Sequence, residues 1–348
     1  MQNLTIPAGF ITSLAISLIA IPSIVKVARG SGLFGIPRGK DQKSRKIPTL
    51  GGLAIFAGII ISLNLYADIA VFPELPFLTA GSLLLFFIGI KDDILIIAPW
   101  WKLIGQILAA LIIVVPGGLM IHDPGSFLGL GPTGKITETV ITVLIIVIII
   151  NSYNFIDGID GLASGIGLYS SLIFGFVFYS AGLHTWLLIA TIYFGSLAGF
   201  AWFNVLGNKN KIYMGDTGSL LLGFILSLML IRFLNIKELY LFKLQIHSPL
   251  AFLLAILIVP LFDILRVILV RTSKLRSPFR PDRQHIHYRM IDAGLTHLQA
   301  SGILIAISLI LSATILALQE LGEIPLILLL LVISAILSYI PCRKKKLF

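Results

Sequence analysis

Charged residues are scarce in this chain of 348 residues, where Asp, Glu, Lys and Arg together make up only 12%. That share is about half of what a soluble globular domain carries. Hydrophobic residues make up 57%, and this balance excludes a soluble protein. Acidic residues are scarcer than basic ones: the chain has 16 Asp and Glu against 26 Lys and Arg, which gives a net charge of +10. In so apolar a chain we interpret the basic excess as a topology signal and not as a nucleic-acid interface.

Cysteine is almost absent as well. The one cysteine is Cys342, which excludes a disulfide framework and a cysteine metal site. The absence of a His-x₃-His pair argues against a structural zinc site. The chain also lacks an internal repeat of 20–50 residues and a low-complexity linker, so we predict a single transmembrane catalytic domain over residues 1–348.

Long apolar runs are what the chain has instead. Runs of about 20 apolar residues cross a bilayer as helices, because every backbone amide must be satisfied within its own segment. The first run, about residues 10–25, lacks a basic start and a small-residue cleavage site, so we expect it to be retained. We predict an all-α, polytopic helical bundle with about eleven transmembrane helices, near residues 9–28, 51–68, 77–90, 103–121, 137–151, 162–181, 186–204, 217–231, 249–270, 300–319 and 324–341.

The distribution of Lys and Arg predicts the orientation. One set of alternate loops holds 20 of these residues and the other set holds 4. Cytoplasmic loops carry the excess of Lys and Arg, so we predict that the N-terminus lies outside and the C-terminus in the cytoplasm. The predicted cytoplasmic segments are 29–50, 91–102, 152–161, 205–216, 271–299 and the tail from 342.

Polar residues gather in four clusters, and the Lys and Arg count places all four on the cytoplasmic side. The clusters are Lys91-Asp92-Asp93, residues 151–161, residues 213–219 and residues 280–287. Carboxylates at or near hydrocarbon are costly and are functional candidates by default. We therefore predict an active face built from the cytoplasmic loops.

The residue types in these clusters indicate the chemistry. An oxygen-rich set suits Mg²⁺, which prefers oxygen ligands and bridges substrate phosphates. Asp216 lies just before a predicted helix start, which favours an anion, and Thr217 and Ser219 add hydroxyl donors. A phosphorylated or diphosphate substrate and metal-assisted phosphoryl transfer are the prediction. The oxygen-rich set is Asp92, Asp93, Asn154, Asp157, Asp160 and Asp216.

Simpler interpretations remain open for each cluster. Asp92 and Asp93 are also compatible with an ordinary span end, and residues 154–158 with an ordinary turn. Asp216 is also compatible with a plain helix N-cap, and the histidines of the last cluster with exposed loop residues. Asp263 and Arg266 lie three apart in the ninth predicted span, and there we favour an intramembrane ion pair.

A transporter is the competing class of function. Acids that line a transport path are expected near the bilayer midplane, in chains built from related halves. Here the acids gather on one face and no repeat is visible. We therefore favour an enzyme.

At these clusters the sequence resembles the polyprenyl-phosphate N-acetylhexosamine-1-phosphate transferases. This family includes phospho-MurNAc-pentapeptide translocase and GlcNAc-1-phosphate transferases that initiate cell-envelope glycans. The resembling segments run in family order and are residues 48–54, 89–93, 151–165, 213–223, 260–263 and 276–290.

The resemblance implies a reaction at the plasma (inner) membrane. An N-acetylhexosamine 1-phosphate passes from a UDP-sugar to polyprenyl (undecaprenyl) phosphate, and UMP is released. Mg²⁺ is implied as cofactor, with Mn²⁺ as an alternative, and a homodimer is possible. The Asp-Arg-Gln-His-Ile-His pattern at 282–287 resembles the GlcNAc branch. UDP-GlcNAc is therefore the expected donor, with UDP-MurNAc-pentapeptide as the alternative.

The resemblance also implies residue roles. Asp216 and Asn154 match the metal ligands, and Asp92 and Asp93 match the pair that positions or deprotonates the lipid phosphate. The nucleotide and diphosphate are expected to meet Asp157, Asp160, Lys102, Asn204, Tyr213, His285 and His287.

Arginines complete the predicted site. Arg280, Arg283 and Arg289 lie in the longest predicted cytoplasmic loop. Guanidinium groups suit bidentate contacts with phosphate oxygens, so we predict that they clamp the diphosphate. The alternative is that they only enforce topology. The sequence departs from the family pattern at Tyr288, which stands where a third histidine is common, and in the more basic link at 207–211.

Overall fold

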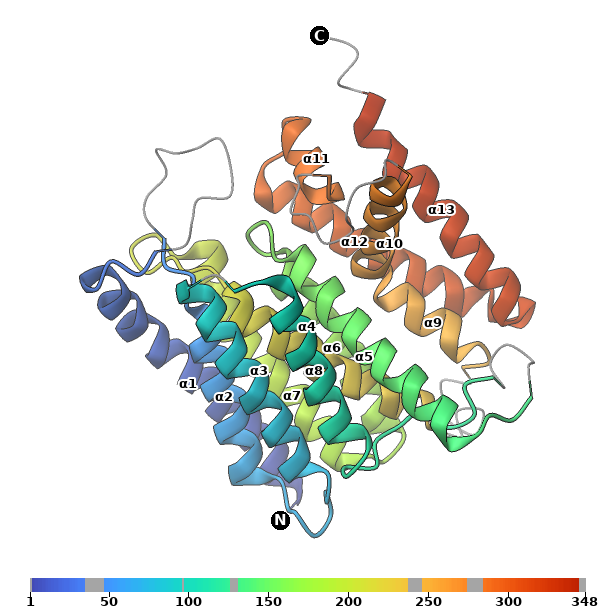
Figure 1. The fold of residues 1–348 in the computed structure, drawn as a ribbon, viewed down its shortest axis with the longest axis horizontal. Coiled ribbons are helices and arrows are strands. Elements are labelled where there is room, and N and C mark those ends of the chain that lie inside the picture. Colours follow the sequence, from blue (N-terminus) through green and yellow to red (C-terminus); the bar gives the residue numbers. More distant parts are fainter. Residues whose placement is uncertain are drawn as a thin grey trace.

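A computed structural model describes residues 2–34, 47–95, 97–125, 131–236, 246–273 and 284–343. Those parts of the chain fold into helices and contain no strand (Figure 1). The α-helices are α1 (Gln2–Gly30), α2 (Gly51–Tyr66), α3 (Leu75–Leu95), α4 (Pro99–Val114), α5 (Lys135–Ile156), α6 (Leu162–Ser180), α7 (His184–Ala201), α8 (Gly215–Leu234), α9 (Pro249–Ile256), α10 (Ile258–Thr272), α11 (Ile286–Asp292), α12 (His297–Ala317) and α13 (Glu323–Arg343). The predicted all-α class is confirmed.

Several of these helices are long and apolar enough to cross a membrane. Seven meet that description individually, and α9 with α10 forms an eighth candidate as one bent pair. Three further apolar helices are shorter: α2, α4 and the part of α13 from Glu323 to Ser338. The protein is therefore a multi-pass membrane protein. The count of eleven crossings and the outward N-terminus stay predictions.

Helix α8 occupies the centre of the bundle. In its most apolar stretch 94% of the residues are buried, against 28% for α1. It contacts α2, α3, α5 and α6, and the first residues of α8 are enclosed with the rest (Figure 1). A helix surrounded in this way cannot shift without displacing its neighbours. The start of α8, which carries Asp216, is consequently a fixed point of the fold.

The ninth predicted span is not one helix. Helices α9 and α10 meet at Leu257 and are bent by 80° relative to one another. Pro260 explains the break, because it has no N–H to donate to the carbonyl four residues earlier and its ring clashes there. Its position in the first turn of α10 is one where that donor is not needed. The span predicted over 249–270 is thus bent at Leu257.

The polar clusters lie on helix ends more than in loops. Asp92 and Asp93 belong to the last turns of α3, and Asn154 to the last turn of α5. The predicted cytoplasmic loops 91–102 and 152–161 are correspondingly shorter. The predicted long loop 271–299 contains a helix of its own, α11. Helices α9 to α13 lie together on one side of the bundle, where α10 contacts α5 and α12 contacts α6 (Figure 1).

Candidate active site

Backbone pairing ties the segment before α2 to the segment before α8. The Tyr213 amide donates to the Pro48 carbonyl at 2.8 Å, and the Gly51 amide donates to the Tyr213 carbonyl at 2.9 Å. The Gly52 amide donates to the Met214 carbonyl at 2.8 Å. These bonds join two of the segments that carry the family resemblance.

Glycines let three helices converge at the start of α8. A Cβ on Gly52 of α2 would lie 2.2 Å from the Gly218 nitrogen, and one on Gly89 of α3 would lie 2.4 Å from the Thr217 Cα. Both contacts are with backbone, which has no room to yield. Gly215 has φ +74°, in the region that favours glycine. The glycines thus bring the end of α3 against the first turn of α8.

Asp93 closes the N-terminus of α8. Its Oδ1 accepts the Asp216 amide at 2.7 Å, and its Oδ2 accepts the Thr217 amide at 3.0 Å and the Thr217 hydroxyl at 2.6 Å. The first amides of a helix have no partner within the helix, and a carboxylate there also opposes the helix dipole. Asp216 is therefore not the cap of α8, because Asp93 performs that function from α3.

Lys102 links two carboxylates from different helices. Its Nζ lies 2.6 Å from Asp92 Oδ2 and also pairs with Asp216 Oδ2. Asp92 Oδ1 accepts the Ile97 amide at 2.8 Å, which fixes the carboxylate at the turn between α3 and α4. We call Asp92, Asp93, Lys102 and Asp216 the acidic cluster. The structure thus brings together four predicted site residues from three helices, α3, α4 and α8.

Asn154 joins the cluster through α8. Its Nδ2 donates to Ser219 Oγ at 2.7 Å, and Ser219 Oγ donates to the Gly215 carbonyl at 3.1 Å. Asn154 is thereby attached to the same first turn of α8 that carries Asp216. This is the pair of residues for which the resemblance implies a metal.

The residues present fit Mg²⁺. Among the described residues no three His, Cys, Asp or Glu side chains form a ready-made cage, but Mg²⁺ usually takes only one or two carboxylates and completes its shell with water and phosphate. The carboxylates of Asp92 and Asp216 already converge on one positive charge, the Lys102 ammonium. Asn154 carries a further side-chain oxygen and is joined to α8 through Ser219. Binding of a cation at this site stays a prediction.

A second group of charges surrounds Asp160, which lies between α5 and α6. Lys211 Nζ lies 2.6 Å from Asp160 Oδ2, and His297 Nδ1 of α12 lies 3.3 Å from the same oxygen. Ser301 Oγ donates to the Asp160 carbonyl at 2.8 Å. Burial raises the pKa of Asp160, but His297 and Lys211 oppose it and the pKa is lowered overall.

Asn204 and Tyr213 border this second group. Asn204 is buried, and its Oδ1 accepts the Gly161 amide at 2.9 Å while its Nδ2 donates to the Ile212 carbonyl at 3.0 Å. It therefore holds the Asp160 turn against the segment that leads to α8. Tyr213 is 36% exposed, and burial together with the charge of Asp160 raises its pKa. Contact of this ring with a nucleotide base stays a prediction.

The two predicted histidines are not exposed loop residues. His285 is 5% exposed and His287 is fully buried. The His285 ring lies 5.3 Å from the Phe155 ring, centroid to centroid. A Cβ on Gly158 would lie 2.3 Å from His287 Nε2, so this glycine is what admits the imidazole. We call residues 284–288 the histidine segment.

The structure describes some of the remaining predicted site residues and leaves others outside the described part of the chain. Asp157 follows the last residue of α5 and is half-buried. Asp263 and Arg266 form the expected ion pair at 3.1 Å. Arg289 lies in α11. Arg280 and Arg283 lie outside the described residues, so their predicted contact with the diphosphate stays a prediction.

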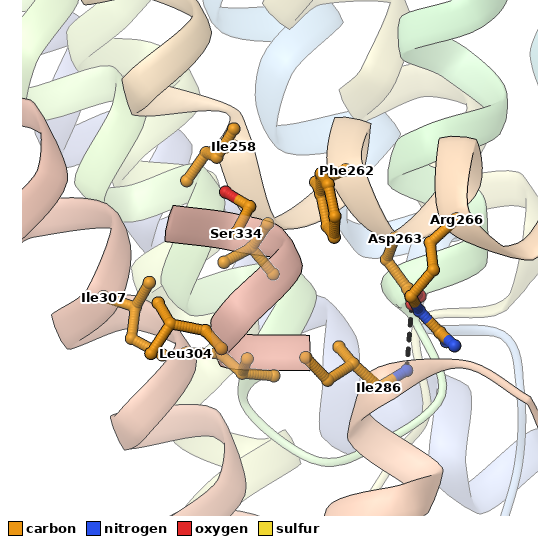
Figure 2. Close-up of a pocket in the computed structure, with 10 residues that line it drawn as sticks. Ile258, Phe262, Asp263, Arg266, Ile286, Leu304, Ile307 and Ser334 are labelled. Carbon is orange, nitrogen blue, oxygen red and sulfur yellow. Dashed lines mark hydrogen bonds and ion pairs between the residues drawn. The ribbon is translucent and has the colours of Figure 1, made fainter. Parts of the chain in front are cut away.

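A small apolar hollow lies between α10, α12 and α13, behind the ion pair of α10 (Figure 2). Asp263 and Arg266 line it together with mostly apolar side chains, among them Ile258, Phe262 and Leu304. The acidic cluster is not part of this hollow. The hollow instead places an apolar surface directly behind Asp263.

Known proteins resemble the chain over nearly its whole length. Residues 75–234 match the family described as glycosyl transferase family 4. The undecaprenyl-phosphate alpha-N-acetylglucosaminyl 1-phosphate transferase of Escherichia coli O157:H7 is 30% identical over 99% of this chain and 93% of its own length. The chain belongs to the polyprenyl-phosphate N-acetylhexosamine-1-phosphate transferase family.

Two further members of the family show its breadth. A probable undecaprenyl-phosphate N-acetylglucosaminyl 1-phosphate transferase of Bacillus subtilis is 29% identical over 92% of this chain and 86% of its own length. A decaprenyl-phosphate N-acetylglucosaminephosphotransferase of Mycobacterium tuberculosis is 26% identical over 82% of this chain and 76% of its own length. The resemblance inferred from the motifs is confirmed.

Sequence reasoning missed two residues of the second group. Lys211 was noted only as part of a basic link, and His297 was not considered. A lysine two residues before the Tyr-Met-Gly-Asp motif was a usable signal for the first. Nothing in the sequence indicated the second, because His297 and Asp160 are 137 residues apart.

Proposed function

We propose that this protein transfers GlcNAc 1-phosphate from UDP-GlcNAc to a polyprenyl phosphate and releases UMP. The observation that carries the proposal is the acidic cluster, in which Lys102 bridges Asp92 and Asp216 at the end of α3 and the start of α8. Phosphoryl transfer requires mainly positioning and charge neutralisation. The names of the relatives from three organisms support the same reaction.

In this reaction an oxygen of the polyprenyl phosphate attacks the phosphorus that bears GlcNAc, and the bond from that phosphorus to UMP breaks. Asp92 orients the acceptor phosphate, and Lys102 offsets the negative charge of the diphosphate. Asp93 keeps its hydrogen bonds to the amides of Asp216 and Thr217, so it holds Asp216 in position. When bound through Asp216 and Asn154, Mg²⁺ would neutralise phosphate charge.

The nucleotide half of the site is built around Asp160 and Tyr213. We propose that Tyr213 stacks on the uracil and that Asp157 and Asp160 contact the nucleoside. Asn204 keeps the Asp160 turn in place through its hydrogen bonds to Gly161 and Ile212.

We propose further that the protein lies in the plasma (inner) membrane with the active site facing the cytoplasm. The excess of Lys and Arg in one set of loops supports this orientation. Cys342 is the sole cysteine and follows the last predicted crossing. An impermeant thiol reagent should fail to label intact cells and succeed after permeabilisation. Labelling of intact cells would reverse the orientation.

The decisive assay of the reaction uses purified protein in detergent with UDP-GlcNAc, undecaprenyl phosphate and Mg²⁺. We expect UMP to form in equal amount to the lipid-linked product, and only when the lipid is present. Chelation should stop the reaction, and added Mg²⁺ or Mn²⁺ should restore it. No UMP under any of these conditions would reject the proposed function.

A competition between donors tests the sugar. UDP-GlcNAc and UDP-MurNAc-pentapeptide are supplied together, and the two lipid products are separated. We expect the GlcNAc product to dominate. Preferential use of the pentapeptide donor would reject the GlcNAc assignment and leave the reaction class intact.

A further inference from the structure

Asp263 of α10 has more partners than an ion pair requires. It is only 2% exposed, and it accepts from His285 Nδ1 at 2.7 Å, from the Ile286 amide at 2.9 Å and from Arg266 Nη2 at 3.1 Å. Two of these three donors belong to the histidine segment. The carboxylate therefore links the bent pair to that segment (Figure 2).

Arg266 strengthens the same link. Its Nη2 donates both to Asp263 and to the Gln284 carbonyl. Two side chains of α10 thus hold the backbone or side chains of three consecutive residues, Gln284, His285 and Ile286. Asp263 itself is almost fully buried, and hydrogen bonds to a buried carboxylate are strong.

The hydrogen bond from His285 to Asp263 determines which ring nitrogen of His285 carries the proton. Asp263 Oδ2 accepts, so His285 Nδ1 must carry hydrogen, and in the neutral ring Nε2 is then the nitrogen with a lone pair. The ring is also packed against Phe155, which follows Asn154 of the proposed metal site. A carboxylate that orients a histidine in this way controls which ring nitrogen meets a ligand.

We propose that Asp263 is a positioning residue for the transfer reaction and acts through His285. It keeps the proton on Nδ1 and holds the ring so that Nε2 is the nitrogen presented to the UDP-sugar. The proposal rests on the proposed function for its effect on turnover. The protonation of His285 is a separate property of the chain and can be measured without turnover.

A double-mutant cycle tests whether Asp263 acts through His285. Asp263→Asn keeps the size of the side chain but places its NH₂ toward Nδ1, which forces the proton to Nε2. We expect kcat to fall about 10–100-fold, the range seen for carboxylates that orient metal-binding histidines, with KM for UDP-GlcNAc changed less. In a His285→Ala background the same change should have less than a twofold effect. An equal loss in both backgrounds would overturn the proposal.

Nitrogen NMR of protein labelled with ¹⁵N-histidine gives a readout that a purely structural role would not move. His285→Gln assigns the signal. We expect Nδ1 of His285 to be protonated in the wild type, and in Asp263→Asn the proton should move to Nε2. An unchanged signal in the folded variant would also overturn the proposal.

Glu323→Gln supplies a matched control. Glu323 is another carboxylate that accepts two backbone amides, those of Leu250 and Ala251 at the start of α9. Glu323→Gln should leave the nitrogen NMR signal of His285 and the value of kcat as in the wild type. If the wild type releases no UMP, the proposed function fails, and the NMR comparison still decides whether Asp263 sets the proton of His285.

Discussion

The acidic cluster and the histidine segment flank the same end of α5, yet they are held in place differently. The acidic cluster rests on the buried helix α8, against which Gly52 and Gly89 bring α2 and α3 into backbone contact. Asp263 and Arg266 of α10 hold the histidine segment through hydrogen bonds to Gln284, His285 and Ile286. Close packing around α8 distributes the anchoring over many backbone contacts, whereas the buried pair of α10 anchors three consecutive residues of the histidine segment. The cluster should therefore tolerate loss of a peripheral contact better than the histidine segment does.

The largest expected effect is that of removing the charge of Asp216. Asp216→Asn keeps the shape of the side chain but weakens its hold on Lys102 and on a cation. We expect kcat to fall by about 10³-fold or more, the upper range for loss of one charge-stabilising group. Turnover is measured as UMP release across Mg²⁺ concentrations. Asp68→Asn, in the exposed turn before α3, is the control and should leave kcat unchanged. Near-normal activity of Asp216→Asn would show that Asp216 is not a metal ligand.

The next prediction tests whether Asp93 holds α8 in place and does not take part in the reaction itself. Asp93→Asn deprives the start of α8 of a charged acceptor for the Asp216 and Thr217 amides. We expect a loss of about 1–3 kcal/mol in the free energy of unfolding, because a buried donor is left poorly paired, and a smaller fall in kcat than for Asp216→Asn.

Thr217→Val is the matched variant for Asp93→Asn, because it removes only the hydroxyl that donates to Asp93. Thermal unfolding in detergent should rank the wild type above Thr217→Val and Thr217→Val above Asp93→Asn. A stability of Asp93→Asn equal to that of the wild type would show that packing alone fixes α8.

A third prediction addresses the nucleotide half, which belongs to neither of the two compared regions. Tyr213→Ala should raise KM for UDP-GlcNAc with a smaller change in kcat. Stacking on a base contributes about 1–3 kcal/mol, equivalent to a rise of about 5- to 150-fold. Tyr179→Ala, whose ring is 68% exposed, should leave KM unchanged. An unchanged KM for Tyr213→Ala would exclude stacking.

The two regions also differ in how far the sequence predicted them. Four of the site residues carry polar oxygens within largely apolar sequence: Asp92, Asp93, Asn154 and Asp216. Because burying such groups in a membrane costs free energy, the sequence alone indicated that they are functional. The capping of α8 by Asp93 was not predicted, because it joins residues 123 apart.

The histidine segment was predicted less well. Asp263 and Arg266 are three residues apart in one helix, and that spacing was sufficient to predict their ion pair. The bond from Asp263 to His285 joins residues 22 apart in the chain, and local spacing carries no information about it. The 80° bend was missed for a similar reason. Pro260 marks a possible break, but the surrounding packing decides how far the helices turn.

The smallest expected effect concerns Lys211, which links the segment before α8 to Asp160. Because the pKa of Asp160 is lowered in the folded protein, its charged form stabilises the fold. That contribution is complete above the ordinary pKa of 3.8 and is lost as the pH falls through the lower folded value. Lys211→Met should therefore be less stable than the wild type at neutral pH, by no more than about 1 kcal/mol for a partly exposed pair.

Unfolding of both proteins at pH 7.5, 5 and 3 measures the effect of Lys211→Met. We expect the same difference at the first two values, where Asp160 stays charged, and a smaller one at the third. Asn210→Met is the control for an added apolar side chain in the same link. A difference that grows toward acid would mean that Lys211 acts through another group. If the stability difference is the same at all three pH values, Lys211 contributes through packing of its aliphatic stem along the Asp160 turn. The segment before α8 would then be held by packing, as the acidic cluster is, and not by a charged pair, as the histidine segment is.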